Sequence, residues 1–185
     1  MEFLQTKLRP ILFLLALVWL VEVVNFIFAH GLTTWGIMPR SLTGLVGIPL
    51  APFIHANFWH ALSNTIPLLV LGGLTLSIGE KRFWLVTIAI VVLSGIMVWV
   101  LARNAYHVGA SGLIFGYFGF LVGRALMERN IVSIAIACLV VALYGGLIWG
   151  LLPTRSFISF EAHLFGLIAG VAVVWLGRSQ GESGA

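Results

Sequence analysis

The sequence predicts an all-α membrane protein, a bundle of six transmembrane helices with one long loop between the first two. Composition and hydropathy predict this fold class. Apolar residues make up 61% of the 185 residues and charged residues only 9%, and the mean hydropathy is +1.10, whereas soluble domains are roughly half apolar and a quarter charged. Because a spanning helix needs about 20 apolar residues, the chain has room for about five to seven spans and none for a soluble domain.

Six runs with few charged residues are predicted to be the spans. They cover residues 11–29, 60–78, 83–101, 111–123, 131–151 and 161–176. The first run is too long for a secretory signal and carries Ile27 where cleavage would need a small residue, so we expect it to be retained. Residues 1–178 are therefore predicted to form one membrane domain, and residues 179–185, rich in Gly and Ser, a flexible tail.

The distribution of positive charge predicts the orientation. Cytoplasmic loops collect Lys and Arg, and an even number of spans puts both termini on one side. With the N-terminus inside, the cytoplasmic side holds Lys7, Arg9, Lys81, Arg82, Arg124, Arg129 and Arg178, and the outer side holds Arg40, Arg103 and Arg155. The larger cytoplasmic group predicts an N-in, C-in protein.

The small number of charges also limits partners and cofactors. A net charge of +4 from scattered residues excludes a nucleic-acid partner, which would need clustered Lys and Arg, and leaves the lipid bilayer as the expected environment. The single cysteine, Cys138, can form no intramolecular disulfide. A zinc site built from His55 and His60 would need a third ligand at suitable spacing, and none is evident. We therefore expect no metal and no cofactor.

The loop of residues 31–59 is unusually long for so small a protein. It is neither charged nor low in complexity, and such a loop usually has a function. Its tryptophans, phenylalanines and prolines suit the headgroup region, with part of the loop dipping into the bilayer. Short helices are expected within it, but no membrane crossing.

A serine and a histidine are predicted to share one depth near the outer face. At about 1.5 Å per helical residue, Ser111 lies about 20 Å from Arg124. His163 lies about 22 Å from Arg178 by the same count, in a hydrocarbon layer roughly 30 Å thick. Ser111 and His163 can therefore meet.

That pairing indicates nucleophilic catalysis. A neutral histidine within hydrogen-bond reach of a serine hydroxyl can remove its proton during attack on a carbonyl. His60 and Asn64, four residues apart on one helix face, lie at or just above the same layer, where polar donors can stabilise an oxyanion. The sequence contains no aspartate, and Glu161 lies on a different helix face from His163. A hydrolase would therefore use a Ser111/His163 dyad.

Each polar residue also has a structural interpretation. A lone serine in a membrane helix is most often a packing residue, and Asn64 could equally join two helices through a hydrogen bond. His163 is costly inside a membrane, which favours a function. His30, His55 and His107 lie in or beside outer loops, where a solvated role is the default.

Small residues and one acid indicate how the helices pack. Glu22, one turn before Asn25 in the first span, should face the protein interior or water, and a structural hydrogen bond is its favoured role. Glycines four residues apart let helices approach closely, and we expect them to bring the fourth and sixth spans together. The pairs are Gly112 with Gly116, Gly119 with Gly123, and Gly166 with Gly170.

These residues resemble the motifs of the rhomboid family of intramembrane serine proteases. The family's histidine and asparagine, four residues apart on the second span, match His60 and Asn64. Its Gly-x-Ser-Gly motif matches residues 109–112, and its Ala-His pair followed by two glycines four apart on the sixth span matches residues 162–170. The three motifs occur in the right order, from the first outer loop to the sixth span.

The resemblance implies an intramembrane serine endopeptidase with a six-span fold. Ser111 would be the nucleophile, His163 the general base, and His60, Asn64 and the Ser111 backbone amide the oxyanion site. The supporting positions would be His55, Gly109, Gly112, Phe115, Gly166 and Gly170. The implied substrate is a transmembrane helix of another membrane protein, cut near the outer face after a small residue. Movement of the fifth span and of the segment that covers the site would admit it, and this movement would involve residues 142–160. We expect the plasma (inner) membrane of a prokaryote.

Two departures and two other function classes accompany this hypothesis. Phe115 stands where many members carry a tyrosine that stacks on the histidine, and Val46 and Gly47 stand where a Trp-Arg pair is common.

A catalytically inactive relative that binds membrane clients is the first alternative, which retention of all four polar residues disfavours. A small transporter or channel is the second, which would need polar residues through both leaflets.

Overall fold

The computed structural model describes residues 2–153 and 159–182, and within these ranges the regular secondary structure is helical, as predicted. The long helices are α1 (Glu2–Ile27), α3 (Phe58–Leu76), α4 (Glu80–Leu101), α5 (Ser111–Glu128), α6 (Ile131–Tyr144) and α7 (Phe160–Glu182). Short helices fill the connections: η1 (Gly31–Trp35), η2 (Thr43–Leu45), α2 (Gly47–Leu50), η3 (Ala51–Phe53) and η4 (Gly145–Leu151). Ile37 and His107 form an isolated antiparallel bridge.

Four helical stretches in the described residues are long and apolar enough to cross a membrane. They are Leu8–Ile27, Glu80–Leu101, Ile131–Leu151 and Phe160–Gly177. Helices α3 and α5 are not among these four stretches; α3 carries His60 and Asn64, and α5 carries Arg124 and Glu128 in its last turns. The chain is thus an integral membrane protein, and the count of six spans stays a prediction.

Each predicted span falls on a helix, with differences at the ends. Helix α5 extends past the predicted end at residue 123 and stops before Arg129, whose φ of 51° lies in the left-handed region. The predicted span 131–151 divides at Gly145, where α6 gives way to the 3-10 helix η4. Helix α7 continues to Glu182, and both the rest of the predicted tail and Arg155 lie outside the described residues.

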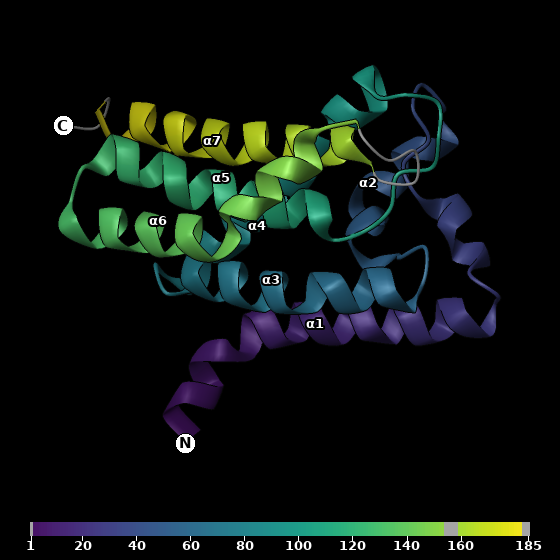
Figure 1. Cartoon of the computed structure of the whole chain (residues 1–185), viewed down its shortest axis with the longest axis horizontal. Coiled ribbons are helices and arrows are strands. Elements are labelled where there is room, and N and C mark those ends of the chain that lie inside the picture. Colours follow the sequence, from purple (N-terminus) through teal and green to yellow (C-terminus); the bar gives the residue numbers. More distant parts are fainter. Residues whose placement is uncertain (1, 154–158, 183–185) are drawn as a thin grey trace.

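Helices α5 and α7 lie side by side, with α5 in the interior of the bundle and α7 along one edge (Figure 1). Glycines make this contact, as predicted: a Cβ on Gly166 would overlap the carbonyl oxygen of Gly112, and one on Gly170 would overlap the carbonyl oxygen of Gly116. Helix α5 is also enclosed on its other sides, and Tyr117 and Phe120 are buried. The first turn of α7 is thereby held against the first turn of α5.

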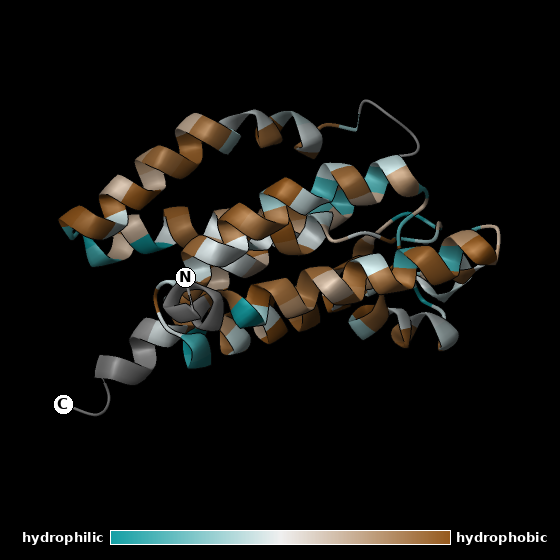
Figure 2. Cartoon of the chain, turned by 90° about the horizontal axis from the view of Figure 1, so that it is seen from below, coloured by the Kyte–Doolittle hydropathy of each residue, from teal (hydrophilic) through white to brown (hydrophobic). Residues whose placement is uncertain are grey.

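The outer surface of the bundle is apolar. Figure 2 shows hydrophobic residues along the middle stretches of the helices and hydrophilic residues mostly toward the ends and loops. Large side chains such as Val23, Leu85 and Ile134 are exposed, as expected of helices that face lipid. Both termini lie toward one end of the bundle (Figure 1), which agrees with an even number of crossings.

The loop between α1 and α3 folds onto the opposite end of the bundle, and its short helices confirm that part of the prediction. The Arg40 guanidinium donates to the carbonyl of Ala102 at 2.8 Å, and the Trp99 indole donates to the carbonyl of Ser41 at 2.8 Å. Ile48 packs against Gly95 of α4. The loop is therefore a fixed cap on the ends of α4 and α5.

Buried polar groups connect this cap to α1. Asn25 is fully buried, and its side-chain amide donates to the carbonyl of His55 at 2.8 Å. The His55 Nε2 accepts from the backbone N–H of Ala110 at 3.3 Å. Glu22, also buried, lies 3.2 Å from His30 Nε2, which fits the expected structural hydrogen bond. Hydrogen bonds thus run from α1 through His55 to the residue before Ser111.

The expectation that His55 and His107 are solvated is wrong. Both are buried, because the cap covers His55 and the bridge to Ile37 draws His107 inward. Burial, with His60 nearby, lowers the pKa of His55 from 6.5 to about 3, against the opposing effect of the Phe53 carbonyl. His55 is therefore a neutral acceptor at physiological pH.

Adding a side chain at position 170, where glycine has none, should destabilise the bundle. A methyl group there meets the Gly116 carbonyl oxygen and the Phe120 amide, so we expect Gly170→Ala to lower the free energy of unfolding by about 2 kcal/mol. Thermal unfolding in detergent measures the effect. Gly73→Ala is the matched control, because a Cβ at Gly73 meets no atom within 4 Å. Equal melting temperatures for the two variants would refute the tight α5–α7 contact.

Acid should weaken the fold through His55. The unfolded chain takes up a proton at His55 below its ordinary pKa of 6.5, whereas the folded chain does so only near 3. The folded state is therefore disfavoured increasingly as pH falls between these values, by at most about 1.4 kcal/mol per pH unit. In His55→Gln, which keeps an acceptor but does not titrate, the loss of stability from pH 7.5 to pH 4.5 should be smaller than in wild type. An identical loss would contradict the assignment.

Candidate active site

A cavity of about 610 Å³ opens at the capped end of the bundle. All four polar residues singled out in the sequence line it: His60 and Asn64 from α3, Ser111 from α5 and His163 from α7. Its volume lies in the range of pockets that take small ligands or short peptide segments. The residues predicted to act together are thus brought to one space.

Ser111 is the first residue of α5, and a strained turn places it there. Gly109 has a φ of +113°, which favours glycine, and its N–H donates to the Ala51 carbonyl at 2.8 Å. A Cβ on Gly109 would lie 2.7 Å from the His60 ring. Gly109 therefore allows both the turn and the close approach of His60. Backbone N–H groups in the first turn of a helix lack intrahelical partners, so the Ser111 amide is available as a donor.

The Ser111 hydroxyl makes no hydrogen bond to another protein group in the described part of the chain. It is half-buried and borders the cavity. No Ser111–His163 hydrogen bond is formed either, and catalytic hydrogen bonds are often long until substrate binds. The hydroxyl is thus not committed to helix packing, the usual role of serine in membrane helices.

Two contacts fix the His163 ring. The ring stacks on Phe115, with centroids 4.3 Å apart and planes inclined by 7°. Its Nδ1 lies 2.8 Å from the carbonyl oxygen of Gly150 in η4. Because Ser111 and Phe115 are one turn apart on α5, they share the helix face on which the ring rests. Phe115, at the position where the family resemblance leads us to expect a tyrosine, therefore makes a stacking contact with the ring.

His60 and Asn64 face the same cavity from α3. The Asn64 side-chain amide donates one hydrogen bond to the His60 carbonyl at 2.9 Å, which leaves a second N–H for another acceptor. The His60 ring packs edge-on against His55, with centroids 5.0 Å apart. Polar groups from α3 and from the start of α5 thus line one cavity.

Sequence reasoning missed a polar cluster at the rim of the cavity. His107 Nδ1 lies 2.5 Å from the Ser159 hydroxyl, and the Arg103 guanidinium lies 3.3 Å from Glu161. Burial is the main cause that lowers the pKa of His107. Ser159 also accepts from the Ala162 N–H at 3.3 Å, the pattern of a helix N-cap. A serine shortly before an apolar helical run could have indicated this cap.

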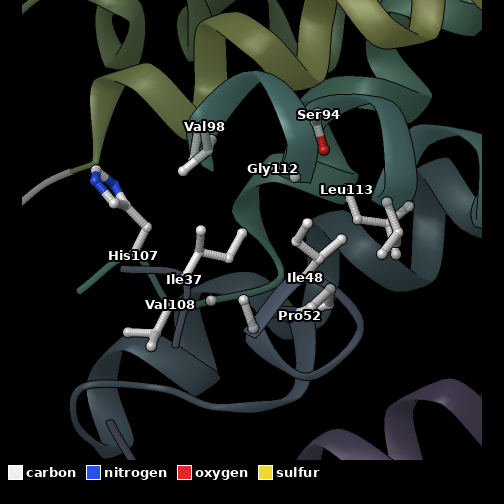
Figure 3. A pocket seen from close by; sticks show the side chains of 14 residues that line it. Ile37, Ile48, Pro52, Ser94, Val98, His107, Val108, Gly112 and Leu113 are labelled. Atoms are coloured by element: carbon white, nitrogen blue, oxygen red, sulfur yellow. The ribbon is translucent and has the colours of Figure 1, made fainter. Parts of the chain in front are cut away.

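A second, much smaller cavity lies on the other side of the turn before α5 (Figure 3). Its volume is about 30 Å³, which is room for a water molecule but not for a peptide. Figure 3 shows mostly aliphatic side chains around it, among them Ile37, Ile48 and Val98. Of these two cavities, the larger is therefore the one with room for a peptide segment.

Comparison with known proteins relates the chain to one family. Residues 40–180 match the model of the Rhomboid domain. A Mycobacterium tuberculosis protein described as uncharacterized is 38% identical over 189 residues, covering 93% of this chain and 79% of that protein. The chloroplast protein named "Rhomboid-like protein 11" of Arabidopsis thaliana is 34% identical, covering 68% of this chain and 50% of that protein. The Bacillus subtilis protein named "Putative rhomboid protease YdcA" is 32% identical, covering 66% of this chain and 62% of that protein.

The matched region runs from the cap to the end of α7 and includes every residue of the larger cavity that was predicted from the sequence. The chain therefore belongs to the rhomboid family.

Proposed function

We propose that the protein is an intramembrane serine endopeptidase in which Ser111 is the nucleophile and His163 the general base. The observation that carries this proposal is the meeting, in one cavity of about 610 Å³, of an uncommitted serine hydroxyl and a histidine held in place by two contacts. Membership of the rhomboid family and a relative named as a rhomboid protease support it.

The reaction begins with proton transfer. His163 Nε2 takes the proton of the Ser111 hydroxyl as the oxygen attacks the peptide carbonyl, and the protonated ring then gives that proton to the leaving amine. The chain contains no aspartate, and Glu161 pairs with Arg103 rather than His163. Water then hydrolyses the ester on Ser111 with His163 acting again as the base.

Negative charge on the carbonyl oxygen needs donors during the attack. We assign this role to the backbone N–H of Ser111, the free N–H of Asn64 and the His60 ring, because these three residues line the same cavity. Aligned donors of this kind stabilise an oxyanion strongly in a site that excludes bulk water. Gly109 supports this arrangement, because a larger residue would displace the His60 ring.

The substrate is a transmembrane helix of another membrane protein, cut near its outer end where the helix can unwind. Pro67 and Ser63 of α3 and Leu147 of η4 line the cavity, so it extends between α3 and the segment formed by α6 and η4. Ile148 and Trp149 of η4 are exposed, at 60% and 71%. A substrate can enter there by displacing the least buried wall, in an N-in, C-in protein of a prokaryotic plasma membrane.

The buried polar groups elsewhere argue against the other function classes. Thr87 and Thr75 lie deep in the bundle, and each donates to a carbonyl of its own helix, so they leave no polar path for a transported solute. An inactive client-binding relative would not need an uncommitted serine beside a positioned histidine. Catalysis therefore explains more of the site than binding or transport does.

Removal of either member of the dyad should abolish cleavage. Purified protein in lipid vesicles is expected to cut a single-span model substrate, and Ser111→Ala or His163→Ala should reduce the rate by at least about 10⁴-fold, because each removes the chemical step. Gel analysis of the products measures the rate. Ser77→Ala, at the opposite end of α3, is the matched control and should cleave normally. Normal cleavage by Ser111→Ala would exclude the assigned nucleophile.

A further inference from the structure

We propose that the backbone carbonyl of Gly150 is the group that orients His163 and selects its tautomer, so that η4 supplies a positioning group for the Ser111/His163 dyad. The inference rests on the proposed function, because it concerns the base of that reaction. The observation is the 2.8 Å contact between His163 Nδ1 and the Gly150 oxygen.

The chemistry of the two atoms decides which ring nitrogen carries the proton. A carbonyl oxygen can only accept, so the Nδ1 atom beside it must donate. A neutral imidazole has one N–H, and Nε2 is then left with a free lone pair. The free lone pair is what a general base needs to take the proton of Ser111. The Gly150 carbonyl therefore does for the ring what a buried carboxylate does in a three-residue triad.

The bond also strengthens as the reaction proceeds. When Nε2 takes the serine proton, the ring becomes positively charged, and a charged N–H donor makes a stronger hydrogen bond than a neutral one. The carbonyl thus favours the transition state over the resting state, which lowers the barrier. Phe115 fixes the plane of the ring, and the Gly150 carbonyl fixes its rotation within that plane.

Glycine at position 150 is what allows the carbonyl to come this close. A Cβ there would lie 3.0 Å from Phe115 Cζ and 3.1 Å from His163 Nδ1, both tighter than ordinary van der Waals contact. Any larger residue must push η4 or the His163 ring aside. By contrast, a Cβ on Gly146 in the same 3-10 helix would meet no atom within 4 Å.

The location of Gly150 gives the contact a consequence for substrate entry. None of the residues of η4 is buried, and η4 forms one wall of the route between α3 and α6. Displacing η4 withdraws the Gly150 carbonyl from His163. His163 is then held in its active orientation only while η4 occupies its present position. The return of η4 after a substrate has entered would therefore restore the active orientation of the base.

Nitrogen NMR of the unmodified protein tests the tautomer directly. Protein labelled with ¹⁵N-histidine is placed in lipid bilayers, and the His163 resonances are identified by their loss in His163→Ala. We expect a protonated Nδ1 and an unprotonated Nε2. A protonated Nε2, or rapid exchange between both tautomers, would overturn the inference. This readout does not require cleavage, so a correct tautomer in a protein that fails to cleave would refute the proposed function instead.

Substitution in η4 tests the catalytic consequence. Gly150→Ala should lower kcat by about 10- to 100-fold, within the range of general acid–base contributions, with KM unchanged, and should convert the His163 NMR pattern to a mixture of tautomers. Gly146→Ala should match wild type in both measurements. Equal kcat values and equal NMR patterns for the two variants would overturn the inference. If Gly150→Ala fails to fold, the tautomer in the wild-type protein decides.

Discussion

The close contact between α5 and α7 is the constraint on which the rest of the structure depends. The carbonyl oxygens of Gly112 and Gly116 in α5 occupy the space that a Cβ on Gly166 or Gly170 of α7 would need. The absence of these Cβ atoms allows the two backbones to touch. Helices in a bilayer gain little from apolar burial against one another, so close packing of small residues must supply the attraction. The same contact sets the first turns of α5 and α7 side by side, and Ser111 and His163 are both in those first turns.

A polar site within an apolar bundle also needs its remaining groups satisfied. The cap meets part of this need: the Asn25 amide donates to the His55 carbonyl, and His55 Nε2 accepts from the Ala110 N–H. An unpaired buried polar group is costly in an environment without water. Among the described residues, Glu22 Oε2 and His55 Nδ1 are buried without a hydrogen-bond partner, whereas the unbonded Ser111 hydroxyl is half-buried and borders a cavity.

The sequence was sufficient for an all-helical membrane fold, for the positions of the helices and for the grouping of four polar residues around one cavity, because each depends on a local pattern. Hydropathy marks the helices, glycine spacing marks the α5–α7 contact, and polar residues within apolar runs mark the site. Two features could not be predicted. The burial of His55 and His107 depends on how the cap folds across the helix ends, a contact between distant segments. The acceptor for His163 is a backbone carbonyl of Gly150, and a carbonyl has no residue type to reveal it.

The central claim is that Ser111 is a nucleophile activated within the bundle. The most direct measurement is to react the folded protein with a fluorophosphonate, which bonds covalently to activated serine oxygens, and to locate the adduct by mass spectrometry of the peptides. The account predicts a single adduct on Ser111 that is lost when His163 is replaced by alanine. An adduct on a different serine, or one on Ser111 that forms equally well without His163, would contradict it.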